Sequence, residues 1–97
     1  MSFQTRRRSH APDVIAPDGS EVRILGATAR GSMAEFTLPP GAVSKPVAHR
    51  TVEEVWVFIG GKGRIWRRHA NIEDVTDVHP GISVTIPVGT AFQFRCD

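Results

Sequence analysis

Short apolar runs separated by turns that contain Gly or Pro set the pattern of this chain. The runs are rich in Val, Ile, Phe and Trp, which is typical of β-strands, and the turns include "APDGS", "GGKG" and "HPG". No segment has the pattern of a long amphipathic helix. The pattern predicts strands over residues 21–25, 32–38, 55–59, 64–68, 75–78, 82–86 and 92–96.

Strands of this length and spacing predict an all-β fold, either a sandwich or a small barrel. No internal repeat or domain linker interrupts them, so residues 13–97 are expected to form a single domain. Residues 1–12 are expected to form an N-terminal arm or an edge strand that a partner chain uses.

Alternation along extended backbone then predicts which side chains share a face. One face of an extended segment 47–59 would carry Val47, His49, Thr51, Glu53, Val55, Val57 and Ile59. The other would carry Arg50, Glu54, Trp56 and Phe58. Because the first set is mostly aliphatic, it predicts the inner wall of a barrel with His49, Thr51 and Glu53 at its mouth. In the last strand, Phe92, Phe94 and Cys96 are expected to point inside.

Composition narrows the class of protein. A chain of 97 residues is one small domain, and its 40% hydrophobic and 23% charged residues suit a soluble globular protein. No apolar run approaches the roughly 20 residues that cross a bilayer, and the basic start lacks the apolar stretch of a secretory signal. The single cysteine suits a reducing cytosol, so we expect a cytoplasmic protein without membrane contact.

Residues 41–60 resemble the first sequence motif of the cupin superfamily, G-x5-H-x-H-x3-E-x6-G. Gly41, His49, Glu53 and Gly60 occupy the matching positions, and Val47 stands where the first His would be. Residues 81–96 resemble the second motif, G-x5-P-x-G-x2-H-x3-N. Its Gly, Pro and Gly are matched by Gly81, Pro87 and Gly89, whereas Phe92 replaces the His and Cys96 the Asn.

The resemblance implies a small double-stranded β-helix or jelly-roll barrel that is often dimeric and that binds a metal through three His and one Glu. Only His49 and Glu53 of that set remain. Val47 and Phe92 stand at the two other ligand positions, and their side chains have no lone pair that could bind a metal. We therefore expect no cofactor or a weakly bound divalent metal. Three other histidines are candidates for a further ligand, although the pattern places them in turns or the arm: His10, His69 and His79. Because the second motif lies at the end of the sequence, the barrel is expected to lack the family's usual last strands.

Aromatic residues outside the expected lumen indicate which partners the protein could bind. Trp56 and Phe58 are assigned to the outer face, which favours a homodimer in which they are buried. Trp66 lies among arginines, but interspersed acidic residues indicate a solvated hairpin face, so no nucleic-acid partner is expected. Cys96 is interpreted as a small apolar filler rather than a reactive thiol.

The favoured function is that of a small-molecule-binding cupin with a degenerate metal site. Its expected ligand contacts are Val47, His49, Thr51, Glu53, Phe92 and Phe94. One alternative is a metal-dependent cupin enzyme of the dioxygenase or sugar-isomerase type, with His49 and Glu53 as surviving ligands. A second alternative is a structural or interaction protein without a ligand. The sequence does not decide whether a reaction is catalysed.

Overall fold

The computed structural model describes residues 3–97, which contain nine β-strands and no helix. Residues 1 and 2 of the predicted arm lie outside the described residues. The strands are β1 (Val14–Ile15), β2 (Glu21–Ala27), β3 (Ser32–Thr37), β4 (Val47–Ala48), β5 (Glu54–Val57), β6 (Gly63–His69), β7 (Ile72–Val78), β8 (Ser83–Ile86) and β9 (Ala91–Cys96). Across residues 3–97, no helix is long and apolar enough to cross a membrane.

The chain divides into two compact units, and the first of them ends at Thr37. Its strands form an antiparallel sheet in the order β1-β2-β3, with an irregularity in register between Ile24 and Gly26. Residues 3–12 contain no strand. They are held to this sheet by Arg8, whose guanidinium donates to both carboxylate oxygens of Glu35 at 2.7 and 2.8 Å. The Arg8 hydrogen bond is the main reason that the pKa of Glu35 lies below its usual value.

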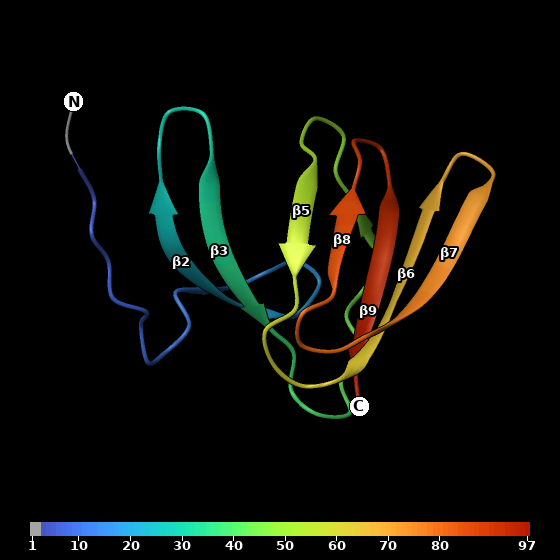
Figure 1. The fold of residues 1–97 in the computed structure, drawn as a ribbon, viewed down its shortest axis with the longest axis horizontal. Coiled ribbons are helices and arrows are strands. Elements are labelled where there is room, and N and C mark those ends of the chain that lie inside the picture. Colours follow the sequence, from blue (N-terminus) through green and yellow to red (C-terminus); the bar gives the residue numbers. More distant parts are fainter. Residues whose placement is uncertain (1–2) are drawn as a thin grey trace. The chain divides into compact units, whose positions relative to one another are not determined.

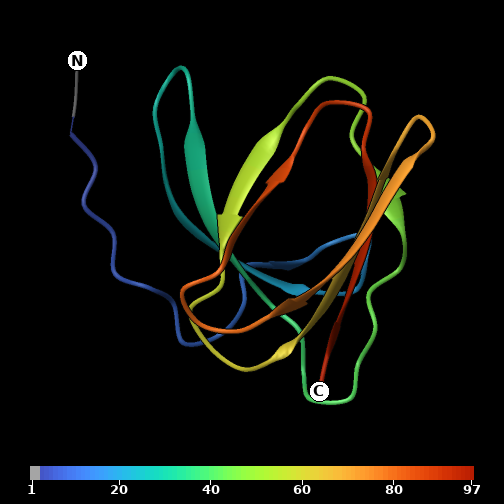
Figure 2. The ribbon, with the colours of Figure 1, turned by 45° about the vertical axis from the view of Figure 1, so that its right-hand side comes forward.

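The second unit, Leu38–Asp97, contains two antiparallel sheets. One has the strand order β4-β9-β6-β7, and the other pairs β5 with β8 (Figure 1). Figure 2 shows the two sheets as separate layers. Neither sheet closes into a barrel.

The core of the second unit lies between these two sheets. Its buried members come from both: Ile65, Val78, Val84, Ile86, Phe92 and Phe94. Ile65 and Ile86 have no exposed surface, and they belong to the same cluster as Phe92 and Phe94 of β9. The apolar residues of β6, β8 and β9 therefore alternate inward as a half-buried strand requires.

The structure confirms the all-β fold that the sequence predicts. Each of the seven predicted strands is present, with its ends moved by at most a few residues. The two strands that the pattern missed, β1 and β4, have two residues each. The division into an arm and one domain stays a prediction.

The predicted faces of the 47–59 segment are wrong from residue 54 onward. Trp56 and Phe58 pack against the core, whereas Val55, Val57 and Ile59 are 79%, 62% and 72% exposed. The segment is not continuously extended, since bends at Arg50 and Thr51 separate β4 from β5. A bend of this kind reverses which alternate residues face inward.

This correction changes the basis of the dimer prediction. Trp56 and Phe58 are not an outer apolar patch, and the exposed apolar residues of β5 and the following loop are Val55, Val57 and Ile59. The ring of Trp56 instead meets Phe92 and Phe94 edge to face, with centroids 5.2 and 5.5 Å apart. The homodimer itself stays a prediction.

Candidate functional site

The side chains of His49 and Glu54 meet at one end of the second unit's inner face. His49 follows β4 and is held by its carbonyl oxygen, which accepts a hydrogen bond of 2.9 Å from the Gly89 amide. Its Nε2 lies 3.1 Å from Glu54 Oε1, and its ring lies 5.6 Å from that of Phe92. Glu54 faces inward here because the bend before β5 turns it toward the core side.

The structure brings together only some of the predicted ligand contacts. Phe92 and Phe94 are buried, and Val47 packs against the same core. Thr51 and Glu53 are exposed, so the carboxylate beside His49 is that of Glu54 and not that of Glu53. Throughout residues 3–97, no three His, Cys, Asp or Glu side chains are grouped closely enough to hold a metal ion.

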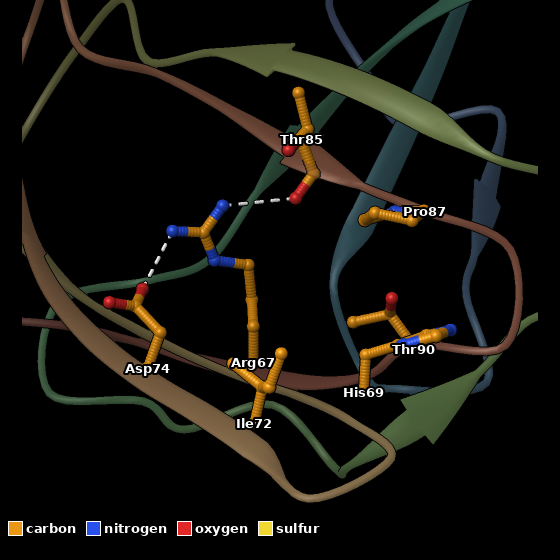
Figure 3. Close-up of a pocket in the computed structure, with 7 residues that line it drawn as sticks. All are labelled: Arg67, His69, Ile72, Asp74, Thr85, Pro87 and Thr90. Atoms are coloured by element: carbon orange, nitrogen blue, oxygen red, sulfur yellow. Dashed lines mark hydrogen bonds and ion pairs between the residues drawn. The ribbon is translucent and has the colours of Figure 1, made fainter.

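Arg67 lies on the inner face of β6, two residues beyond the buried Ile65. Its Nη1 donates to the Thr85 carbonyl oxygen of β8 at 3.0 Å, and its Nη2 donates to Asp74 Oδ2 of β7 at 2.6 Å (Figure 3). The guanidinium thus links three strands and both sheets. Its Nε is enclosed by protein and has no hydrogen-bond partner among residues 3–97.

A pocket of about 180 Å³ opens beside Arg67. Its lining consists of Arg67, His69, Ile72, Asp74, Thr85, Pro87 and Thr90 (Figure 3). Thr90 is only 2% exposed, and its hydroxyl has no hydrogen-bond partner. His69 lies next to the β8–β9 turn, since its Nε2 would be 3.8 Å from a Cβ at Gly89.

Enclosed polar atoms without hydrogen bonds gather at this end of the inner face. Among the described residues they are Arg67 Nε and Thr90 Oγ1, and the enclosed Glu54 Oε1, which lies 3.1 Å from His49 Nε2, is at the same end. The strand pairing explains why they share one end. Glu54 begins β5 opposite Ile86, the last residue of β8, and Thr90 directly precedes β9, whose first residues pair with Arg67 and Arg68.

Hydrogen bonds hold the pKa of Asp74 below its usual value. The Thr76 hydroxyl is the larger cause and the Arg67 guanidinium the second. Both donate to Oδ2, at 2.7 and 2.6 Å. The lowered pKa keeps Asp74 ionised as the partner of Arg67.

Replacing Thr76 with Val is expected to raise the pKa of Asp74 toward its ordinary value, because the larger of the two hydrogen bonds is lost. Since the native pKa lies below the unfolded one, the stability linked to Asp74 is present above about pH 4 and is lost as the pH falls through the native pKa. Carboxyl NMR titration of Asp74 measures the shift. Ser83→Ala, on the exposed face of β8, is the control, and an unchanged Asp74 pKa in Thr76→Val would contradict the assignment.

The opposite face of the larger sheet carries a second, smaller hollow of about 110 Å³ around Trp66. Its polar side chains already have partners. Trp66 Nε1 donates to Glu73 at 2.6 Å, Arg64 pairs with Asp77 at 2.7 Å, and Gln93 donates to the Ser44 carbonyl. Within residues 3–97, none of the enclosed polar atoms that lack a partner belongs to the lining of this hollow, which distinguishes it from the pocket beside Arg67.

Sequence reasoning missed Arg67, Asp74 and Thr90, assigned Glu54 to the outer face, and considered His69 only as a possible metal ligand in a turn. Arg67 and His69 were within reach of the alternation rule, because Ile65 is plainly a core residue and both lie on its side of β6. Glu54 was misplaced because alternation was carried through the bend at residues 50 and 51. No sequence pattern identifies Thr90, because it lies in a turn, where the direction of its hydroxyl depends on the folded structure.

Comparisons with family models, with curated proteins and with solved structures find no match for this chain, so the cupin resemblance stays a proposal.

Proposed function

We propose that residues 38–97 form a cupin-like unit that binds a small molecule at the polar end of its inner face. The turns support the cupin-like part of the proposal. Gly41, Gly81 and Gly89 match motif glycines, and they adopt φ angles of 79°, 96° and 79°, the left-handed region that favours glycine. The motif spacing thus coincides with turns that need this residue type.

The observation that carries the binding proposal is the unpaired hydroxyl of Thr90 in the wall of the pocket. Buried polar side chains in folded proteins nearly always have a hydrogen-bond partner, and an unmatched one costs about 1–3 kcal/mol. Here Thr90 Oγ1 and Arg67 Nε, from two residues of the same lining, both lack one. Both atoms are enclosed in the free protein, so a ligand would satisfy them only if the two side chains turn toward the pocket on binding.

The remaining lining suits a small organic molecule. Ile72 and Pro87 offer apolar contact beside the polar atoms, the mixture typical of ligand sites. The pocket lies below the range of about 300–1,000 Å³ that holds drug-sized ligands, so the ligand is expected to be compact.

A tightly bound transition metal does not fit the side chains at this end. Zinc needs three or four protein ligands, and His49 and Glu54 provide two that are already in contact with each other. We therefore propose that the site works with no cofactor or with a weakly bound divalent metal at most. Glu53, the carboxylate that the resemblance assigned to the metal, is exposed.

Thr90→Val is expected to stabilise the free protein and to weaken ligand binding at the same time. The valine keeps the shape but removes the unmatched hydroxyl, so the free energy of unfolding should rise by about 1 kcal/mol. Ligand-observed NMR with a fragment mixture should show fewer or weaker binders. Urea unfolding measures the first effect, and Ser83→Ala on the exposed face of β8 is the control for both.

The proposal fails if Thr90→Val loses stability and binds fragments as the parent does. That result would mean that the hydroxyl has a structural partner, such as an ordered water, and has no part in recognition.

A further inference from the structure

The N-terminal segment carries a run of arginines next to a serine. Arg6, Arg7 and Arg8 directly precede Ser9, and residues 3–12 contain no strand. The side chains of Arg6 and Arg7 are exposed, and neither forms a hydrogen bond or an ion pair with another of the residues 3–97. Two positive charges therefore stand beside this serine without a partner of their own.

The hydroxyl of Ser9 is open to solvent. Ser9 as a whole is half-buried, and its carbonyl oxygen accepts a hydrogen bond of 2.9 Å from Arg23 Nε. Within residues 3–97 no hydrogen bond engages its Oγ, and this atom is not among the enclosed polar atoms that lack a partner. An oxygen that is neither bonded nor enclosed is one that an enzyme can reach.

The spacing of the free arginines matches the way in which some protein kinases select their substrates. Such kinases recognise charge patterns around the acceptor, and carboxylates are the groups that bind arginine most strongly. Arg6 and Arg7 lie three and two residues before Ser9. A kinase whose substrate groove carries carboxylates at these two positions would therefore bind this segment with Ser9 at the site of transfer.

The other serines among residues 3–97 lack this combination of charge and access. Ser20 and Ser44 are buried. Ser83 is exposed but has no arginine among the three residues before it, and Ser32 has only Arg30 there. Ser32 also belongs to β3, so its backbone is paired with β2. It is the natural internal comparison.

A phosphate on Ser9 would lie close to the bonds that hold the segment to the first unit's sheet. The neighbouring Arg8 donates to both carboxylate oxygens of Glu35, and Arg23 donates to the carbonyl oxygens of Ser9 and His10. A phosphoserine carries a charge of about −1.5 to −2 at pH 7, which attracts arginine and repels carboxylate. It would compete with Glu35 for Arg8.

We propose that Ser9 is phosphorylated by a serine kinase that selects arginine-rich substrates, with ATP as the donor, and that the phosphate weakens the Arg8–Glu35 pair. In the reaction the Ser9 Oγ attacks the γ-phosphorus of ATP, and the bond from that phosphorus to the ADP oxygen breaks. The hydroxyl proton passes to the base of the kinase, so the products are phosphoserine and ADP. This inference is independent of the small-molecule site proposed for residues 38–97.

The first test uses the full chain, the catalytic domain of an arginine-directed serine kinase, and ATP with magnesium. Peptide mass spectrometry locates the phosphate, and initial rates give kcat/KM. We expect Ser9 to be the main acceptor, and we expect Arg6→Ala and Arg7→Ala each to lower kcat/KM about ten-fold, the effect of one hydrogen bond to a charged group. Arg30→Ala is the matched control and should leave the rate at Ser9 unchanged.

Three results would overturn the assignment of the acceptor. They are no modification at all, modification of Ser32 as fast as that of Ser9, and a rate at Ser9 that Arg6→Ala and Arg7→Ala leave unchanged. The arginine variants are informative because these two side chains make no contact within residues 3–97 that the fold would lose.

The second test measures the effect of the phosphate on the pair. The Arg8 hydrogen bond is the main cause of the lowered pKa of Glu35, so both its loss and the added negative charge should raise that pKa. Carboxyl NMR titration of phosphorylated and unmodified protein compares the two states, and kinase-treated Ser9→Ala is the control. An unchanged pKa of Glu35 in protein phosphorylated at Ser9 would refute the weakening of the Arg8–Glu35 pair.

Discussion

Replacing Trp56 with Ala should lower the free energy of unfolding by about 3–5 kcal/mol, the usual effect of removing a large aromatic side chain from a core. Trp56 packs against the core of the second unit and meets the rings of Phe92 and Phe94 edge to face. Its loss would leave a cavity between the two sheets, in contact with the inner face that carries the candidate site.

The control is the neighbouring residue on the same strand. Val55→Thr keeps a β-branched side chain and lies on the exposed face, where surface substitutions usually stay within about 0.5 kcal/mol. Chemical denaturation of both variants measures the difference. A small effect for Trp56→Ala with a large one for Val55→Thr would restore the face assignment made from alternation alone.

The second large effect is expected at Gly63, where Ala should destabilise the fold by about 3 kcal/mol or more, at or above the usual range for overpacking. A Cβ on Gly63 would overlap the backbone carbonyl oxygen of Arg95 on β9 and lie 3.1 Å from its carbonyl carbon. Both atoms belong to the backbone of a paired strand, so relief would require β6 and β9 to separate.

Gly60 provides the matched control for Gly63. No atom lies within 4 Å of a Cβ built there, and its φ is not in the left-handed region. Gly60→Ala is therefore expected to change the free energy of unfolding by less than about 0.5 kcal/mol. Thermal and urea unfolding measure the free energy of unfolding of the two variants. Equal destabilisation by Gly63→Ala and Gly60→Ala would contradict the close approach of β6 and β9.

This contrast also bears on the motif. Gly60 is the last glycine of the first cupin pattern, yet its geometry does not require glycine, whereas Gly61 has a φ of 73° and Gly63 allows no side chain. The motif glycines at residues 41, 81 and 89 do lie at positive φ. The pattern therefore identifies the turns at these three positions more firmly than at Gly60.

The strands could be predicted because each is a short apolar run bounded by Gly or Pro, and both signals are local. The faces of β5 could not, because its two sets of alternate residues are both apolar: Val55 and Val57 on one side, Trp56 and Phe58 on the other. The inner face was chosen because the set that contains Val55 and Val57 is mostly aliphatic, but the segment bends at Arg50 and Thr51 and the structure has the opposite face inside. In β9 the same rule succeeded, since polar Gln93 and Arg95 alternate with buried Phe92 and Phe94.

The sequence identified only some of the residues that the structure places at the candidate site. His49 was identified through the motif, and the structure places it in contact with Glu54 rather than beside Glu53. The pocket depends on side chains from β6, β7 and the β8–β9 turn that come together only through strand pairing. Sequence spacing does not contain that information, because the register between strands is set by tertiary packing.

Fragment soaking of crystals tests the central claim most directly, because it shows where small molecules bind without assuming their chemistry. The account predicts that small organic fragments occupy the pocket lined by Arg67, His69 and Thr90, within hydrogen-bond distance of Thr90 Oγ1. Fragments found only in the hollow around Trp66, with the Thr90 pocket empty or holding ordered water, would contradict it.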